Sequence, residues 1–198
     1  MIPNASEKVL ALFKDSDALL QGHFKLTSGK HSEWYFEKIR LIEKPSALEK
    51  IIDLLVDKIR AAKLDFEYVV SPAYGAIAIG FLAALKLGKK FAFSQRLDEK
   101  MSFRSGFTGL DGSTAIIVED ILTTGGSIIE VVECLKQRGV EVAGIYVLVD
   151  RTAGQAPIEG RPVGSLLPLK VEAYDPDVCP FCKNGIPLTK PGASDKKR

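Results

Sequence analysis

The stretch AIIVEDILTTGGS, residues 115–127, decides the fold class because it joins a strand to a helix through a loop of small residues. Its opening apolar run is uninterrupted, which is typical of a strand buried on both faces of a parallel sheet. Two carboxylates, Glu119 and Asp120, stand at the carboxyl end of this strand. Open α/β sheets bind ligands at that end of their strands. We therefore expect a ligand site around the two acids.

The loop that follows the acids has the composition of a phosphate-binding loop. Gly125 and Gly126 let the backbone approach an anion closely, and the helix N-terminus adds free N–H groups and the positive end of its dipole. Hydroxyl side chains on either side of the glycines are further donors. The loop lacks the lysine of GxxxxGK[ST] and the spacing of GxGxxG. The acids fit a ribose diol beside the phosphate; the alternative is that they only cap the loop.

Strands and helices alternate along the rest of the chain. We expect helices within the first twenty residues and at 46–59, 75–87 and 126–138, and strands at 66–70, 91–93, 114–118, 142–149 and 166–171. The second helix carries a capping-box pattern, Ser46 and Glu49. The polar stretch 94–112 is expected to be irregular. This order predicts an α/β fold, a parallel sheet flanked by helices on both faces, in a single domain over residues 1–198.

Composition limits the classes of partner. The chain has 198 residues, 26% charged and 46% apolar side chains, and a formal net charge of +2. This charge is too small to favour nucleic acid or an anionic membrane as a partner. No apolar run is long enough to span a bilayer, and the first residues lack a signal-peptide pattern. We expect a cytoplasmic protein with a basic tail at residues 190–198.

Three cysteines are too few for a disulfide framework. Cys134 falls in the helix expected at 126–138 and is interpreted as a small buried residue. Cys179 and Cys182 form a CxxC in a segment rich in proline and glycine. A tetrahedral zinc site needs four ligands, and the sequence offers no second CxxC and no nearby histidine. A structural turn is therefore favoured, with a metal shared between subunits as the alternative.

The chain has two histidines, His23 and His31, and both lie in its N-terminal part. A lone histidine is more often a hydrogen-bonded structural residue than a catalyst. We favour the structural interpretation for both.

The segment VEDILTTGGS resembles the phosphoribosyl pyrophosphate signature of the type I phosphoribosyltransferases. The resemblance implies the fold of that family, with a small hood built from about residues 1–40 and 152–185. It also implies that Glu119 and Asp120 hold the ribose hydroxyls. The 5′-phosphate would be held by Thr123, Thr124, Gly125, Gly126 and Ser127.

Three further segments are similar to the orotate phosphoribosyltransferase family. They are GHFKLTSGKHSEWYF (residues 22–36), SPAYG (residues 71–75) and the pair Asp150-Arg151. The first implies part of the hood over the base. The second implies a pyrophosphate-binding loop formed by Ala73, Tyr74 and Gly75, whose backbone N–H groups suit that role. The arginine of the third implies a contact with orotate, because a planar guanidinium fits the carboxylate and ring carbonyl of this base.

The polar stretch Ser94–Phe107 falls where this family has a mobile catalytic loop. The resemblance implies that Arg96 and Lys100 approach pyrophosphate when the loop closes. Leu97 and Ser102 depart from the family pattern, since many members have a basic residue and a histidine there. In the N-terminal segment Thr27 likewise stands where other members have lysine, and Lys30 is the candidate to replace it.

The resemblance implies transfer of phosphoribosyl from phosphoribosyl pyrophosphate (PRPP) to orotate, with Lys100, Arg96 and Asp120 as the catalytic side chains. Mg²⁺ would be bound through PRPP and water, with no direct protein ligand. A homodimer is implied, in which the loop at 94–107 reaches the neighbouring active site. Two alternatives stay open. One is transfer to another base, a purine or uracil, and the other is a PRPP-sensing regulator, although the chain has no room for a DNA-binding module.

Overall fold

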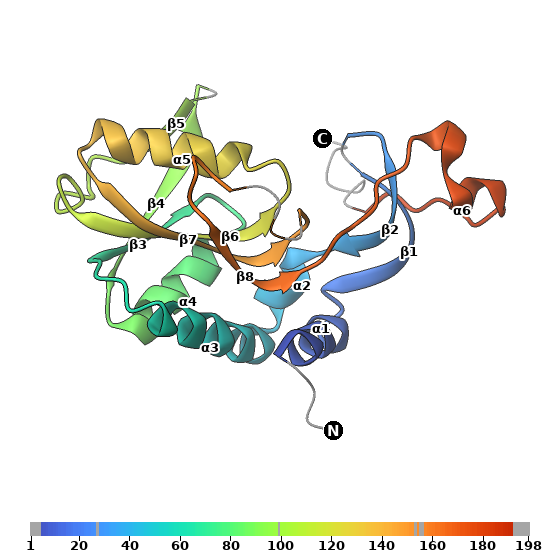
Figure 1. Ribbon diagram of the computed structural model, residues 1–198, viewed down its shortest axis with the longest axis horizontal. Coiled ribbons are helices and arrows are strands. Elements are labelled where there is room, and N and C mark those ends of the chain that lie inside the picture. The colour runs from blue at the N-terminus through green and yellow to red at the C-terminus, as the bar shows by residue number, and fades with distance from the viewer. Residues whose placement is uncertain (1–4, 27, 99, 153, 155–156, 192–198) are drawn as a thin grey trace.

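The computed structural model describes residues 5–26, 28–98, 100–152, 154 and 157–191 (Figure 1). A six-stranded sheet forms its centre, in the order β5-β4-β3-β6-β7-β8. Five of these strands are parallel, and β5 at the edge pairs antiparallel to β4. The strands are β3 (Tyr68–Pro72), β4 (Lys90–Leu97), β5 (Lys100–Phe103), β6 (Thr114–Leu122), β7 (Glu141–Asp150) and β8 (Val163–Pro168). Within the described residues, no helix is both long enough and apolar enough to cross a membrane.

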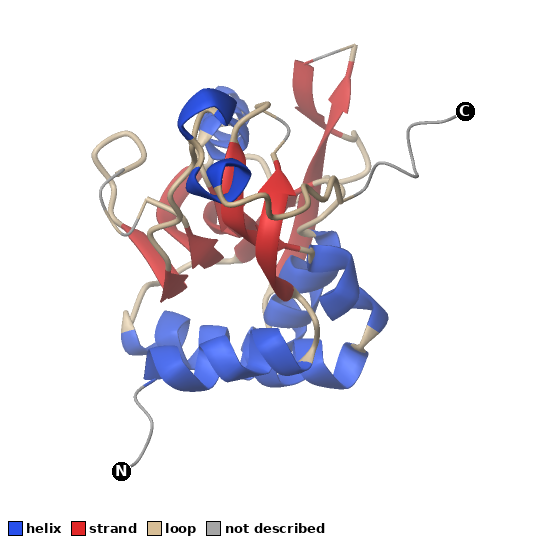
Figure 2. Ribbon diagram, turned by 90° about the vertical axis from the view of Figure 1, so that its right-hand side faces the viewer, coloured by secondary structure: helices blue, strands red, loops and turns tan. Residues whose placement is uncertain are grey.

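Helices cover both faces of this sheet, as Figures 1 and 2 show. One face carries α5 (Gly126–Gln137), and the other carries α1 (Ala5–Asp15), α3 (Pro45–Ala61) and α4 (Ile77–Leu87). The short helix α2 (Lys38–Glu43) precedes α3. Each helical layer buries its own apolar cluster against the sheet, because β6 is apolar toward both sides. The predicted α/β class is confirmed.

A second, smaller part of the chain lies beside the carboxyl ends of the strands (Figure 1). The antiparallel hairpin of β1 (Leu19–Lys25) and β2 (His31–Phe36) forms it together with the C-terminal segment. That segment contains the 3₁₀ turn η1 (Pro176–Val178) and the single helical turn α6 (Pro180–Lys183). It pairs with the hairpin through isolated bridges from Tyr174 to His31 and from Thr189 to Phe24. The sequence pattern predicts no strands for this hairpin.

Three details differ from the sequence-based expectations. The capping box is wrong, because α3 begins at Pro45 with Lys44 as its N-cap, and Glu49 instead accepts a hydrogen bond from Lys86. The stretch 94–112 is not irregular throughout, because β4 continues to Leu97 and turns back into β5. The strand predicted at 114–118 runs on to Leu122, so both acids lie within it. Cross-strand pairing overrides the polarity of these residues.

The helix faces can be tested with two leucines of opposite exposure. Leu55 on α3 is fully buried, whereas Leu85 on α4 is 66% exposed. We expect Leu55→Ala to lower the free energy of unfolding by about 2–5 kcal/mol, because it leaves a cavity in the core. Leu85→Ala is the matched control and should change it by less than about 0.5 kcal/mol. Urea denaturation followed by circular dichroism measures both, and equal losses would contradict the assigned faces.

Candidate active site

Two adjacent carboxylates at the end of β6 form the centre of the site. Glu119 and Asp120 are both buried, and the backbone N–H of Asp120 donates to Glu119 Oε1 at 3.0 Å. Lys38, the first residue of α2, places its Nζ 2.5 Å from Asp120 Oδ2. The ammonium group pairs with Asp120, and its charge also acts on Glu119. The structure brings the predicted acid pair into a buried, partly neutralised arrangement.

The acid pair is held close to neutrality by its surroundings. Burial, together with the negative charge of Asp120, raises the pKa of Glu119 to about 8. Burial lowers the pKa of Lys38, but the charge and hydrogen bond of Asp120 and the charge of Glu119 raise it by more, so its net shift is upward. Near neutral pH the group of three side chains can thus take up or release a proton on Glu119.

Lys38 is the site residue that sequence reasoning missed. Its ammonium group lies beside Gly75, where a Cβ would meet both Lys38 Nζ and Asp120 Oδ2. The glycine therefore leaves the space that the lysine head group occupies. Lys38 lies two residues after the segment 22–36 whose resemblance was recognised. A lysine at the start of a short helix carries no pattern of its own, so only the packing identifies it.

The loop after β6 has the geometry of an anion-binding site. Gly125 is the N-cap of α5 and has φ +82°, a conformation that favours glycine. A side chain there would also meet Ile158. No side chain caps the helix, and its first turn contains no acid, so the N–H groups and the dipole of α5 face the loop. The phosphate-binding interpretation of this loop stays a prediction, and the geometry supports it.

The loop and the acids line one cavity of about 410 Å³. Facing them are Ala73, Tyr74 and Gly75, which follow β3, and Arg96, whose Nη2 lies 2.7 Å from Glu130 Oε1. The neighbouring strands β3 and β6 end side by side, which explains how segments far apart in sequence meet here. Of the residues predicted to bind PRPP, these are the ones brought together: Ala73, Tyr74, Gly75, Arg96, Glu119, Asp120, Thr123, Thr124, Gly125, Gly126 and Ser127.

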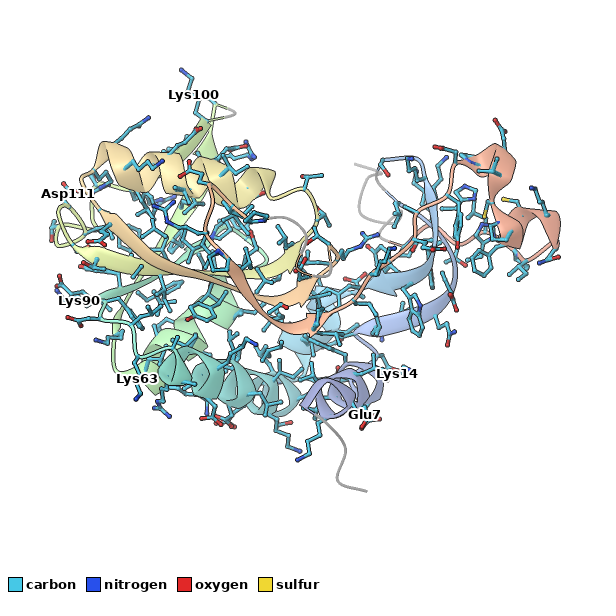
Figure 3. All side chains as sticks on the ribbon, in the orientation of Figure 1. Glu7, Lys14, Lys63, Lys90, Lys100 and Asp111 are labelled. Carbon is cyan, nitrogen blue, oxygen red and sulfur yellow. The ribbon has the colours of Figure 1, made fainter. Side chains whose placement is uncertain are left out.

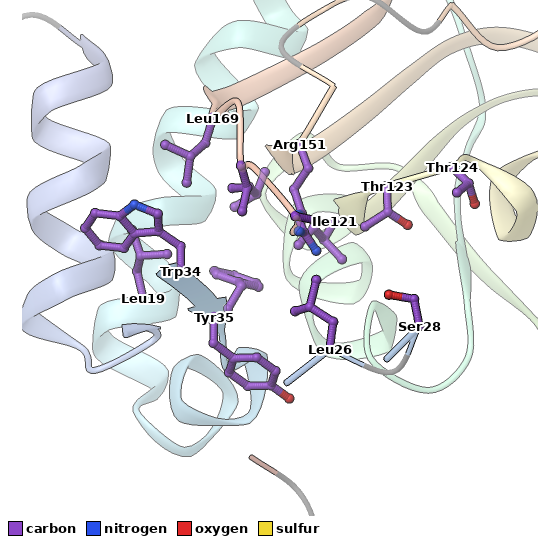
Figure 4. A pocket seen from close by; sticks show the side chains of 14 residues that line it. Leu19, Leu26, Ser28, Trp34, Tyr35, Ile121, Thr123, Thr124, Arg151 and Leu169 are labelled. Carbon is purple, nitrogen blue, oxygen red and sulfur yellow. The ribbon is translucent and has the colours of Figure 1, made fainter. Parts of the chain in front are cut away.

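A second cavity, of about 490 Å³, adjoins the first, because Ile121, Thr123 and Thr124 line both. Its walls are otherwise largely apolar and aromatic, and the β1–β2 hairpin supplies a large share of them. In Figure 4, Arg151 lies between Trp34 on one side and the two threonines on the other. The residues of this wall are Leu19, Leu26, Ser28, Trp34, Tyr35, Phe36, Val149, Leu169, Val171 and Ala173.

Arg151 is half-buried in this wall, and burial lowers the pKa of its guanidinium. Its side chain forms no ion pair or hydrogen bond with any residue of the described ranges. The preceding Asp150 is buried and shapes the loop, since its carboxylate accepts bonds from the backbone N–H groups of Thr152 and Gly154 at 2.8 and 2.7 Å. A desolvated cation without a counterion leaves room for an anionic ligand.

Two predicted residues lie outside these cavities. Lys30 is paired with Asp175 of the C-terminal segment at 3.3 Å and lines neither cavity. Lys100 begins β5 and lies at the tip of the β4–β5 hairpin, as Figure 3 shows, and it does not line the cavity of the acids. Thr27, which stands where relatives have lysine, lies outside the described residues. The roles expected of Lys30 and Lys100 stay predictions.

Known proteins share this arrangement of segments. Residues 40–175 match the phosphoribosyl transferase domain. An orotate phosphoribosyltransferase from Desulforamulus reducens is 41% identical over 187 residues, which cover 94% of this chain and 96% of that protein. The chain belongs to the orotate phosphoribosyltransferase family.

Solved structures of orotate phosphoribosyltransferases and their relatives show the same fold. The enzyme from Aeropyrum pernix superposes with a TM-score of 0.64 at 27% identity, covering 80% of this chain and 92% of its own. The UMP synthase of Leishmania donovani superposes with a TM-score of 0.68 at 23% identity, covering 81% of this chain and 35% of that one. The resemblance seen in residues 118–127 is confirmed, as is the type I phosphoribosyltransferase fold.

The raised pKa of Glu119 predicts a pH dependence of stability in this orotate phosphoribosyltransferase family member. A carboxyl whose pKa is higher in the folded than in the unfolded chain favours folding when protonated, so its contribution is lost as pH rises from about 4.5 to about 8. Glu119→Gln removes this loss. We expect the variant to gain at least about 2 kcal/mol over the parent between pH 5 and pH 8, since each pKa unit corresponds to about 1.36 kcal/mol.

Urea unfolding at both pH values measures this difference. Glu67→Gln is the control, because Glu67 forms only an exposed pair with Lys90, and its difference should stay below about 0.5 kcal/mol. A Glu119→Gln difference that does not change with pH would show that the acid pair is fully ionised across this range.

Proposed function

We propose that the chain transfers the 5-phosphoribosyl group from PRPP to orotate, giving orotidine 5′-monophosphate and pyrophosphate in pyrimidine biosynthesis. The observation that carries the choice of base is Arg151, a half-buried guanidinium without a described counterion in an aromatic cavity. Orotate is a flat ring with a carboxylate, so the ring fits the apolar walls and the carboxylate fits the arginine. A neutral purine or uracil would leave this cation unpaired.

The adjoining cavity suits the ribose and its phosphates. The loop at 123–127 and the first turn of α5 present N–H and hydroxyl donors for the 5′-phosphate. The carboxylates of Glu119 and Asp120 can accept hydrogen bonds from the two ribose hydroxyls. The loop at 73–75 lies across the cavity from them and is the candidate for pyrophosphate. Thr123 and Thr124 line both cavities, so the ribose would lie where the cavities join. Its anomeric carbon would then be between the base and pyrophosphate.

The donor set is compatible with Mg²⁺, which prefers oxygen ligands and usually arrives with substrate phosphates. Glu119 and Asp120 supply carboxylate oxygens, but Lys38 already pairs with Asp120, so the chain itself forms no dedicated cage for the ion. Bound through pyrophosphate and water, Mg²⁺ would neutralise the charge of the leaving group.

The protein groups have separate tasks in this reaction. As the bond to pyrophosphate breaks, the sugar ring becomes positively charged, and the buried acid pair stabilises that charge when Glu119 is ionised. Asp120 would contribute to catalysis by holding the ribose. Arg96 lines the same cavity, where it would exchange Glu130 for the departing pyrophosphate, and Lys38 is a second cation beside the loop at 73–75. The aromatic walls keep water from the reacting carbon.

A homodimer is part of the proposal. Lys100 lies at an exposed hairpin tip and does not line the cavity of its own acid pair, and this position suits contact with the site of a second copy. The hairpin 94–107 would then bring Lys100 to the neighbouring pyrophosphate. The cytoplasmic location expected from the sequence stays a prediction.

The first experiment follows the ultraviolet absorbance of orotate after PRPP and Mg²⁺ are added, with uracil, adenine, guanine and hypoxanthine in parallel assays. We expect consumption of orotate alone, and loss of the reaction when a chelator removes Mg²⁺. Turnover of another base would contradict the role of Arg151. If no base reacts, a calorimetric titration with PRPP tests the alternative of a PRPP sensor.

Arg151→Ala tests the base site directly. We expect the KM for orotate to rise about 10- to 100-fold, because a charged hydrogen bond to the carboxylate is lost. The KM for PRPP should change less than about threefold. Arg60→Ala is the matched control, since Arg60 is an exposed arginine that bonds the Lys86 carbonyl. Equal increases in both constants for Arg151→Ala would remove this residue from the base site.

A further inference from the structure

The structure gathers four side chains with the ligand chemistry of a zinc site, far from the acid pair in sequence and in role. His23 of β1, His31 of β2, Cys179 and Cys182 place one ligand atom each within 4.8 Å of one another. The expectation that no histidine lies near the CxxC is wrong. The hairpin and the C-terminal segment meet so that residues about 150 positions apart converge. We propose that this cluster is a structural Zn²⁺ site.

Four of the six distances between the ligand atoms are close to the edges of a coordination tetrahedron, and the other two are within 4.8 Å. With Zn–N of about 2.0–2.1 Å and Zn–S of about 2.3 Å, the edges are about 3.3 Å for N···N and about 3.6 Å for N···S. His23 Nε2 lies 3.0 Å from His31 Nδ1. The Cys179 and Cys182 sulfurs lie 3.5 and 3.7 Å from His23 Nε2, and Cys182 Sγ lies 3.3 Å from His31 Nδ1. All four ligands come from one chain, so no second subunit is required.

The outer contacts of His23 orient it as a metal ligand. Its Nδ1 lies 2.8 Å from the carbonyl oxygen of Ile186, which can only accept a hydrogen bond, so Nδ1 carries the proton and Nε2 presents its lone pair to the cluster. Three other polar atoms converge on that single lone pair. Hydrogen bonding can satisfy only one of them well, whereas an ion at the centre binds all four atoms.

The surrounding segment gives the ion a structural task. Among residues 168–191, Cys179 is the only buried residue, and the apolar side chains of Val178, Ile186 and Leu188 are exposed. Apolar burial therefore contributes little to holding this segment on the hairpin. A metal cross-link between Cys179, Cys182 and the two histidines would supply the missing stabilisation. Cys182 is exposed and gives the ion a route of entry.

Two thiolates and two imidazoles select Zn²⁺ among common divalent ions, and four protein ligands leave no open position for catalysis. The ion would brace the hairpin that carries Leu26, Trp34 and Tyr35 of the larger cavity. That consequence rests on the proposed function, but the metal site does not. Metal content and spectra can be measured without any assay of activity, so the two proposals fail independently.

The test uses the full chain without a histidine tag, purified from zinc-supplemented medium and dialysed. We expect about one zinc per chain by atomic emission. Co²⁺ added to the metal-free chain should give the visible absorption of a tetrahedral site and a thiolate charge-transfer band, and Zn²⁺ should displace it. Absence of stoichiometric zinc together with an octahedral Co²⁺ spectrum would overturn the proposal.

Cys182→Ser and Cys134→Ser form the matched pair of variants. Cys182→Ser should lose stoichiometric zinc and expose residues 172–191 to limited proteolysis. Cys134, whose thiol donates to the Met101 carbonyl in another part of the fold, should be dispensable for zinc. Equal zinc in both variants would exclude Cys182 as a ligand and overturn the site.

A thiol count on the unaltered chain keeps the proposal testable if Cys182→Ser does not fold. In the zinc-loaded chain, exposed Cys182 should resist a thiol reagent, and two further thiols should react once a chelator is added. Immediate reaction of Cys182 would contradict metal ligation. The appearance of two thiols only after a reductant would show a disulfide instead, and would also overturn the proposal.

Discussion

The active site depends on how a parallel sheet manages two buried carboxylates next to a helix that attracts anions. Glu119 and Asp120 continue an apolar strand, so the same pairing that buries Ile116 and Ile117 also desolvates the acids. Lys38 neutralises Asp120, and burial together with the charge of Asp120 raises the pKa of Glu119. The site therefore starts with little net charge, and a polyanionic substrate can approach the acids without strong repulsion.

The larger, aromatic cavity is built from different elements than the cavity of the acid pair. Its polar member, Arg151, comes from the end of β7 and is presented by a loop that Asp150 organises. Its aromatic members come from the β1–β2 hairpin, which is outside the main sheet. Under the proposed function, the sheet fixes the phosphate and ribose positions, while the hairpin and the last strand ends determine which base fits. Variation in the hairpin can change the base specificity and leave the phosphate loop intact.

Much of the sheet and of the phosphate-ribose cavity could be predicted from the sequence. Continuous apolar runs locate β3, β6 and β7, and the order acid-acid-loop-helix locates the ligand side of β6. The β1–β2 hairpin could not be predicted in this way, because its residues alternate weakly and its partner strand segments lie near the other end of the chain. Lys38 could not be identified as a site residue for a related reason, since it reaches the acid pair only when α2 packs against the 73–75 loop. The capping-box rule failed because Pro45 starts α3 one residue before Ser46. The first part of the polar stretch at 94–112 forms strands because the end of β4 pairs with β5.

Contacts between the hairpin and the C-terminal segment have a consequence for biosynthesis. His23 bonds to Ile186 across 163 residues, and Thr189 pairs with the same strand. A ribosome releases the hairpin early, but the residues that hold it in place emerge only after all the strands of the sheet. The sheet can therefore form before the wall of the larger cavity, which is completed only when the C-terminal segment has emerged.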